Sequence, residues 1–335
     1  MFVRYPPFGK EKADYAYAVG RIRALETRLL DRQRVERLLE AKDAEEVLRS
    51  LQDTDYGAYI PQLESPLAFE GMLEAERTRA FELFEELALE EELVYWVRSF
   101  YDFHNVKVLI KSLIAEKDFR HAISPHGNIP PDDIKAIFQE ERYDKLPDHL
   151  QTAVEKGISS YYEKKDPQRI SLAVDQSAYL YLTGKSVGNA FLRNYFRLQA
   201  DLLNLMTLVR LKFIGREDLI RISLLPGGFL EIERYAQEPL DTLSGRLYHT
   251  PYYAIFDEGI ASLRAKASFS RLYKLMDDYL VGYLKETRTI ALGPEPLIAY
   301  LYGKMNEIKI LRMVFVGKIY HMSREEIRER LPLPY

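Results

Sequence analysis

The sequence predicts an all-α fold built from three similar helical-bundle domains, and three observations support this prediction. Apolar side chains recur at spacings of three and four residues along most of the 335 residues, whereas the alternation typical of strands is hard to find. Only 17 glycines and 16 prolines are present, too few for a loop-rich all-β chain. A faint internal repeat recurs about every 100 residues.

The composition is that of an ordinary globular protein, with 47% hydrophobic and 29% charged residues. A net charge of -4 gives no global attraction to nucleic acid or to an anionic membrane. The absence of cysteine excludes disulfides and thiolate chemistry, and it fits a reducing compartment. The longest segment without a charged residue, His121–Pro131, is far shorter than the ~20 apolar residues of a membrane-spanning helix. We therefore expect no membrane span.

The first elements are predicted from periodicity and from helix-start signals. Residues 10–52 follow a helical pattern, in which Asp43 stands three residues before Glu46, an arrangement that suits a helix start. Residues 70–92 predict a helix rich in glutamate, which we interpret as a solvated acidic face, with a docking strip for a basic partner as the alternative. Residues 304–330 are mainly basic instead, so the two segments are hypothesised to serve different partners.

A core helix is predicted over residues 93–116. Its apolar sector is so wide that other helices must cover most of its circumference. The apolar sector contains Trp96, Phe100, Phe103, Val106, Ile110 and Leu113, and the polar side contains Arg98, Asp102, Asn105, Ser112 and Glu116. Lys107 falls within the apolar sector; we interpret it as a snorkelling or carboxylate-paired lysine whose partner comes from residues 70–92. A catalytic lysine is the alternative.

The pattern of this helix returns twice. Each copy places an acid three residues before an asparagine or its replacement, at offsets of 99 and 106 residues: Asp102 and Asn105, Asp201 and Asn204, then Glu307 and Ile310, with Arg312 at the position of Lys107. A second match pairs residues 50–60 with residues 246–256, equating Leu51, Thr54 and Tyr56 with Leu247, Thr250 and Tyr252. Three similar helical units are the simplest account. We hypothesise that the repeated acids and amides fix the packing between helices within each unit.

No motif for catalysis stands out. Thr183–Ser186 resembles the end of a phosphate-binding loop, but the earlier glycine and the preceding strand are missing. The histidines form no i, i+4 pair that would suit a metal on a helix. The residues therefore favour a noncatalytic helical scaffold without catalytic, cofactor-binding or metal-binding residues.

Five segments in order along the chain carry a resemblance to a known family: Tyr15–Leu30, Asp53–Gly57 (which contains Tyr56 and Gly57), Tyr101–Lys107, Asp166–Tyr179 and Asn306–Arg312. Together they resemble the C subunit of the V-type and A-type rotary ATPases (ATP synthases), the relative of the eukaryotic V-ATPase d subunit. The chain departs from the family at residue 310, where isoleucine replaces the usual asparagine.

The resemblance implies a funnel of three similar domains around a pseudo-threefold axis. It also implies a rotor subunit that rests on the cytoplasmic end of the membrane proteolipid ring and receives the D and F subunits of the central stalk. Such a subunit transmits torque for proton or sodium transport linked to ATP hydrolysis or synthesis. It inserts into no bilayer, binds no nucleic acid and needs no cofactor. An adaptor unrelated to rotary ATPases is the alternative.

Interruptions at residues 121–133 and 215–228 place the expected domain boundaries. The three domains are predicted to span residues 1–122, 123–218 and 219–335.

Overall fold

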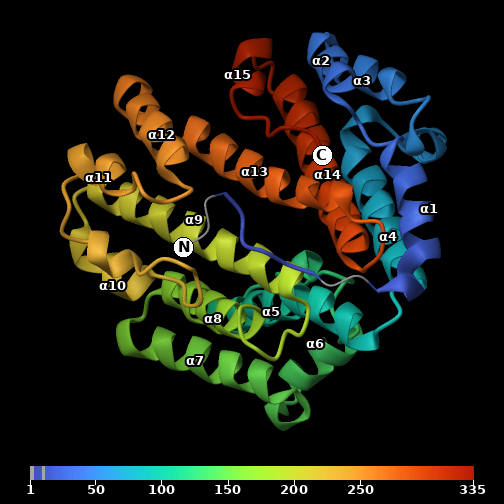
Figure 1. The fold of residues 1–335 in the computed structure, drawn as a ribbon. Helices are drawn as coiled ribbons and strands as arrows, with labels where there is room; N and C mark the ends of the chain where they lie inside the picture. The colour runs from blue at the N-terminus through green and yellow to red at the C-terminus, as the bar shows by residue number, and fades with distance from the viewer. Residues whose placement is uncertain (1–3, 10–11) are drawn as a thin grey trace. The chain divides into compact units, whose positions relative to one another are not determined.

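A computed structural model describes residues 4–9 and 12–335 of the chain (Figure 1). The predicted all-α class is confirmed, because every regular element within this described part is an α-helix or a 3-10 helix. Residues 10 and 11, the start of the predicted helical stretch 10–52, lie outside the described residues. Among the described helices, none has the length and apolar character needed to cross a membrane.

The chain forms two compact units. Unit 1 combines the chain up to Leu89 with Thr242–Tyr335, and unit 2 spans Glu90–Asp241. The boundaries of these units thus fall at 89/90 and 241/242. The division into three domains and their funnel arrangement stay predictions.

Unit 1 contains helices from both ends of the sequence. Its α-helices are α1 (Ala16–Glu26), α2 (Arg32–Glu40), α3 (Ala44–Ser50), α4 (Phe69–Leu87), α12 (Tyr253–Lys266), α13 (Ser270–Lys285), α14 (Glu295–Ile319) and α15 (Arg324–Arg328). Its 3-10 helices are η1 (Ala13–Tyr15), η2 (Asp55–Ala58), η3 (Ile60–Gln62), η4 (Pro66–Ala68) and η9 (Glu286–Thr289). The long helix α14 packs against α4, α1 and α13, as the red ribbon in Figure 1 shows.

Unit 2 is built around two long helices. Its α-helices are α5 (Glu91–Ala115), α6 (Pro131–Gln139), α7 (Asp148–Lys164), α8 (Pro167–Leu182), α9 (Ala190–Phe213) and α10 (Ile220–Ser223). Its 3-10 helices are η5 (Arg120–Ala122), η6 (Tyr143–Lys145), η7 (Glu217–Leu219) and η8 (Ile232–Tyr235), and α11 (Leu240–Arg246) crosses into unit 1. Helices α7 and α8 pack against each other, and both pack against α5.

Local capping explains where several helices begin. The Asp43 side chain accepts a hydrogen bond from the backbone N–H of Glu46 at 2.9 Å, which confirms the predicted start of α3. Asp31 caps α2 in the same way, and Asn189 caps α9. Short sequence signals therefore set the starts of these three helices.

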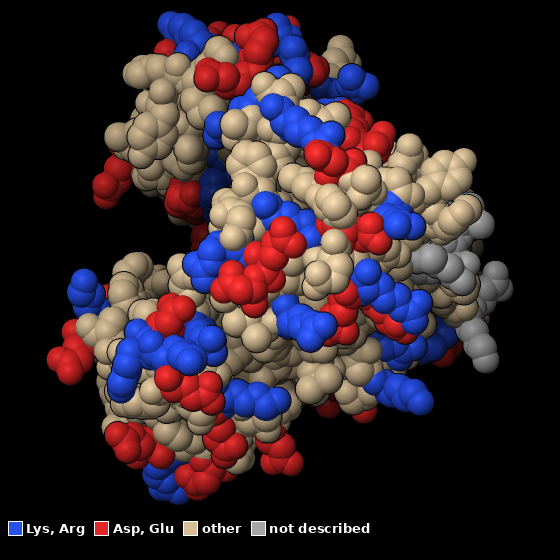
Figure 2. All heavy atoms as spheres, turned by 90° about the vertical axis from the view of Figure 1, so that its left-hand side faces the viewer, with Lys and Arg blue, Asp and Glu red and all other residues tan. Residues whose placement is uncertain are grey.

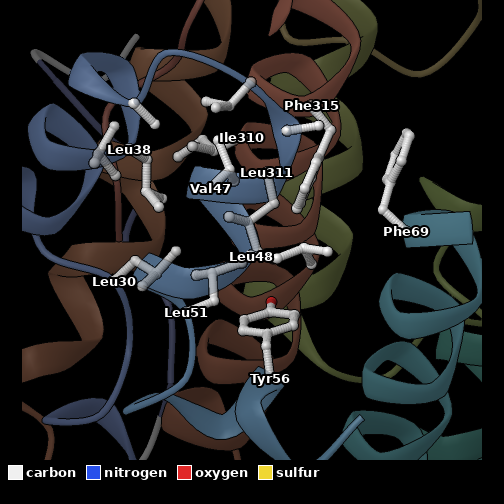
Figure 3. Packing of buried hydrophobic residues seen from close by; sticks show 14 of the residues in the cluster. Leu30, Leu38, Val47, Leu48, Leu51, Tyr56, Phe69, Ile310, Leu311 and Phe315 are labelled. Atoms are coloured by element: carbon white, nitrogen blue, oxygen red, sulfur yellow. The ribbon is translucent and has the colours of Figure 1, made fainter. Parts of the chain in front are cut away.

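The core of unit 1 joins the two ends of the chain. Figure 3 shows Val47 and Leu48 of α3 meeting Ile310 and Leu311 of α14, and all four side chains are buried. Burial of each such aliphatic side chain contributes about 1.5–3 kcal/mol. The N-terminal helices α2 and α3 thus depend on the C-terminal helix α14 for much of their apolar cover.

Candidate functional site

The first copy of the repeated acid and amide lies on α5, where both side chains are buried. Asp102 Oδ1 accepts a hydrogen bond from the backbone N–H of Ile129 at 3.2 Å, and Oδ2 accepts one from Asn128 Nδ2 at 2.7 Å. Asn105 donates to the carbonyl of Ser124 at 2.9 Å and accepts from its N–H at 2.8 Å. The pair therefore fastens the loop that precedes α6, and we call this arrangement a clasp.

The second copy, on α9, repeats the clasp in nearly every bond. Asp201 accepts from the N–H groups of Phe229 and Leu230 at 3.1 and 3.0 Å. Asn204 donates to the carbonyl of Leu225 at 2.8 Å and accepts from its N–H at 2.7 Å. Because backbone N–H groups bind a carboxylate through charge-assisted hydrogen bonds, each clasp fixes a loop against its long helix.

Each clasp also contains an arginine and a glycine, and sequence reasoning, which placed Arg98 on the polar side of its helix, did not recognise that either residue recurs. Arg98 donates to the carbonyl of Gly127 at 3.0 Å, and Arg197 donates to the carbonyl of Gly228 at 3.3 Å. A Cβ on either glycine would collide with the aspartate of its clasp, so only glycine fits. The signal was available, because Arg98 and Arg197 are separated by the same 99 residues as Asp102 and Asp201.

The third copy, on α14, has a different partner. Glu307 Oε2 accepts a hydrogen bond from the backbone N–H of Leu30 at 2.5 Å, and Oε1 accepts from Tyr56 Oη at 2.9 Å and from Lys304 Nζ at 2.7 Å. Ile310, at the asparagine position, is buried in the apolar core of unit 1. The acid of the third copy thus holds N-terminal residues, 277 positions away in the sequence in the case of Leu30.

Lys304 lies at the centre of a buried group of charges, which we call the Lys304 cluster. Its ammonium group lies 2.7 Å from Glu307, 3.0 Å from Glu76 and 3.7 Å from Asp55, and its side chain is only 1% exposed. Arg79 also pairs with Glu76 and Asp55, at 2.7 and 3.0 Å. With the Arg28–Asp55 ion pair, three cations balance three carboxylates within the cluster. Sequence reasoning did not anticipate this cluster, because Lys304, Glu76 and Asp55 share no spacing pattern.

Neighbouring charges keep Lys304 and Glu76 ionised. Burial alone would lower the pKa of Lys304, but the charges of Glu307 and Glu76 raise that pKa above its ordinary value. Burial alone would raise the pKa of Glu76, but the hydrogen bond from Arg79 and the charge of Lys304 hold it below its ordinary value. Burial, reinforced by Glu307, raises the pKa of Tyr56 well above 10, so its hydroxyl stays a donor.

The turn that carries Tyr56 has a counterpart, as the sequence match suggested. Thr54 Oγ1 donates to the carbonyl of Leu51 at 2.6 Å and accepts from the N–H of Tyr56 at 3.3 Å. Thr250 makes the same two bonds with Leu247 and Tyr252, at 2.8 and 3.3 Å. Gly57 follows the first turn, where a Cβ would collide with the carbonyl oxygen of Gln52.

The two basic residues at the equivalent helix position pair with different acids. Lys107 is paired with Asp175 of α8 at 2.6 Å, so it is a carboxylate-paired lysine. The expectation that its partner lies in residues 70–92 is wrong, because α5 packs against α8 along this side. Arg312 does pair with that segment, through bonds of 2.8 to 3.1 Å to Glu70 of α4.

The acidic and basic segments partly neutralise one another. Helices α4 and α14 pack together, and Glu70 and Glu76 of α4 pair with Arg312 and Lys304 of α14. Figure 2 shows a different face, the left-hand side of Figure 1, where acidic and basic side chains are likewise interspersed over the described part. These four residues therefore already pair within the chain, and the hypothesis of separate partners for the two segments stays a prediction.

The predicted apolar sector of α5 is buried only in part. Phe103, Val106 and Ile110 lie in the core of unit 2, whereas Phe100 and Leu113 are 38% and 47% exposed. Asp102 and Asn105, on the predicted polar side, are buried beneath the loop that they bind. A loop that covers polar side chains therefore reverses part of the pattern that the helical periodicity predicts.

The family model of ATP synthase (C/AC39) subunits matches residues 18–330 of this chain. The chain belongs to this family. It is 27% identical to the C subunit of the V-type sodium ATPase of Enterococcus hirae, over 94% of this chain and 97% of that protein. It is also 26% identical to the C subunit of the A-type ATP synthase of Methanocaldococcus jannaschii, over 95% of this chain and 86% of that protein.

Membership in the C/AC39 family confirms the resemblance seen in the sequence. Members of this family are noncatalytic stalk subunits of V/A-type rotary ATPases, so the prediction that the chain is not an enzyme is confirmed. The functional residues of such a subunit are those that maintain its shape and its contacts, and the clasps and the Lys304 cluster are candidates for the first role.

Proposed function

We propose that this C/AC39-family chain couples the central shaft of a V/A-type rotary ATPase to the membrane ring, transmitting torque without performing chemistry. Its partners would be the D and F subunits of the central stalk on one side and the proteolipid subunits of the ring on the other, at the cytoplasmic face of the membrane. The observation that supports this proposal is the match to C-subunit relatives along nearly the whole chain.

The clasps and the Lys304 cluster suit this role physically. A part that transmits torque needs loops and helices that keep their register under load. Apolar packing alone tolerates small displacements, whereas a buried carboxylate loses several charge-assisted hydrogen bonds when its partners move. We propose that Asp102, Asn105, Asp201, Asn204 and Glu307 serve this purpose, together with the Tyr56–Gly57 turn, the Lys107–Asp175 pair and the Arg312–Glu70 pair.

Affinity purification from detergent-solubilised membranes, followed by mass spectrometry, tests the proposed partners. The tagged chain is expected to recover the D, F and proteolipid subunits together with the catalytic subunits. Recovery of the chain alone, or with unrelated soluble proteins, would refute the proposal and favour an adaptor function.

A measurement of coupling tests the proposed role itself. Vesicles that contain the complex without this subunit are expected to lose ATP-driven ion pumping, and added purified chain is expected to restore it. Proton and sodium pumping are measured separately, since either ion can be the one transported. Full pumping without the chain would contradict a coupling role.

A further inference from the structure

We infer that the third copy of the repeat is split between the two ends of the chain, with α14 supplying its long helix and residues 27–89 supplying its loop and shorter helices. This inference does not depend on the proposed function. It makes the N-terminal part of unit 1 conditional on the C-terminal helix, and the structure supports it in three independent ways.

The first support is the register of the clasp. In the first two copies the acid of the long helix binds the backbone N–H of an aliphatic residue two positions before the next helix begins. Ile129 precedes α6, which starts at Pro131, and Leu230 precedes η8, which starts at Ile232. Leu30, the residue held by Glu307, likewise stands two positions before α2, which starts at Arg32. The third acid therefore finds its equivalent loop at the opposite end of the sequence.

The second support is the order of the elements after the loop. After Leu230 the chain forms the short helices η8 and α11 and then the turn in which Thr250 bonds to Leu247 and Tyr252. After Leu30 it forms the short helices α2 and α3 and then a turn with the same bonds, from Thr54 to Leu51 and Tyr56. Both tyrosines are fully buried. The segment after Leu30 thus continues the repeat in the order seen after Leu230.

The third support is the density of contacts between α14 and the N-terminal segment. Lys318 Nζ donates to the carbonyl of Leu39, the last turn of α2, at 2.7 Å. Lys304 and Arg312 pair with Glu76 and Glu70 of α4. The same apolar cluster contains residues of α2, α3, α4 and α14 (Figure 3). Residues 27–89 therefore obtain both polar and apolar cover from α14.

This arrangement delays closure of unit 1 until α14 has been synthesised. During synthesis, N-terminal segments normally fold first. Here, the loop before α2 lacks its carboxylate, and the core of α2 and α3 lacks Ile310 and Leu311, until α14 has been made. The hydrogen bond from the Leu30 N–H to Glu307 can therefore form only after α14 has been synthesised.

Hydrogen–deuterium exchange of the full-length chain, read by mass spectrometry, tests the inference. The carboxylate of Glu307 accepts hydrogen bonds from the Leu30 N–H, from Tyr56 and from Lys304. In Glu307→Gln one of the two carboxylate oxygens becomes an NH₂ group, which cannot accept, and Lys304 and Tyr56 compete with Leu30 for the oxygen that remains. Exchange in residues 27–31 is therefore expected to rise about 10- to 100-fold. Asp201→Asn is the matched variant, expected to act on residues 225–230 and not on residues 27–31. Glu325→Gln, on the exposed side of α15, is the control for loss of one negative charge.

The inference is overturned if Glu307→Gln changes exchange only in residues 295–331, its sequence neighbours, and leaves residues 27–31 as in Glu325→Gln. The wild-type chain provides a second measurement that does not depend on a variant that folds. The Leu30 amide is expected to be protected to a degree similar to the amides of Ile129 and Leu230. A Leu30 amide that exchanges at the rate of an unprotected loop also overturns the inference.

Discussion

Replacing Lys304 with methionine is expected to lower the free energy of unfolding by about 3–5 kcal/mol, because it removes one partner from a buried ionic network. The side chain of Lys304 is 1% exposed, and those of Glu76 and Glu307 are 0% and 6% exposed. Methionine fills a similar volume, so loss of packing contributes little. The change instead leaves three carboxylates facing two arginines.

The magnitude follows from how little water reaches these groups. Glu307 would keep its bonds from Leu30 and Tyr56, and Glu76 would keep Arg79, but the bonds of 2.7 and 3.0 Å from Lys304 would be lost. A buried charge left without its partner costs several kcal/mol, whereas an exposed pair contributes about 1 kcal/mol or less. Arg312→Met supplies the contrast on the same helix, since Arg312 and Glu70 are 36% and 52% exposed.

Urea unfolding followed by far-UV circular dichroism measures both variants, with the midpoint and the slope fitted separately. Both variants remove one positive charge from α14 near α4, so their difference isolates burial. The deficit of Lys304→Met is also expected to shrink as the pH falls, because the charge of Lys304 helps to hold the pKa of Glu76 below its ordinary value, and protonation of Glu76 in the variant relieves the unpaired charge. Equal losses in the two variants, or a Lys304→Met protein as stable as wild type at pH 7, would refute this reasoning.

The clasps lead to three further predictions. Gly228→Ala is expected to lower the free energy of unfolding by about 1–3 kcal/mol, because the new Cβ would collide with Asp201. Gly20→Ala in α1 is expected to raise it by about 0.5–1 kcal/mol, because a Cβ there meets nothing within 4 Å. Thermal denaturation of both variants checks these opposite signs. Asn105→Leu leaves both backbone groups of Ser124 without their partner and is expected to cost about 2 kcal/mol in urea unfolding, and an unchanged midpoint would contradict this. Burial raises the pKa of Asp102 from 3.8 to about 6, so the carboxyl group of Asp102 binds its proton more tightly in the folded protein than in the unfolded chain. The stabilisation that results is fully present below about pH 4 and is lost as the pH rises through 6. Relative to Asp102→Asn, the free energy of unfolding of the wild-type protein is therefore expected to fall by up to about 3 kcal/mol between pH 4 and pH 7. Urea unfolding followed by the fluorescence of the single tryptophan, in α5, measures this difference. A difference between the two proteins that does not vary with pH would count against the prediction.

Sequence periodicity predicted the helices well because it reads the spacing of apolar residues along one segment. Asp43 and the acid–amide pairs were visible for the same reason, since each signal lies within four residues. The partner of Lys107 was not predictable in this way. Its carboxylate lies on α8, 68 residues later, and only the packing of α5 against α8 selects it over the many glutamates of residues 70–92.

The polar side of the repeated helix shows more clearly what sequence periodicity cannot predict. A helical wheel places Asp102 and Asn105 on the polar side of the helix but cannot show what covers that side, and both residues are buried. The wheel cannot include a loop, and here a loop supplies the hydrogen-bond partners that offset the cost of burying these groups. The repetition of the pair, which the wheel ignores, was the better indicator of its importance.

The third copy departs from the first two both at the asparagine position and in the partners of its acid. With Ile310 in place of asparagine, the third copy lacks the amide that grips both backbone groups of one loop residue. The acid there is the longer glutamate, which binds Leu30, Tyr56 and Lys304 at once and joins the Lys304 cluster. The first two copies hold loops that lie 19 to 29 residues further along the chain, where closure costs little entropy. The third holds a segment 277 residues away, where closure costs more entropy, and the apolar contacts that α14 makes with α2, α3 and α4 are the contacts able to offset that cost.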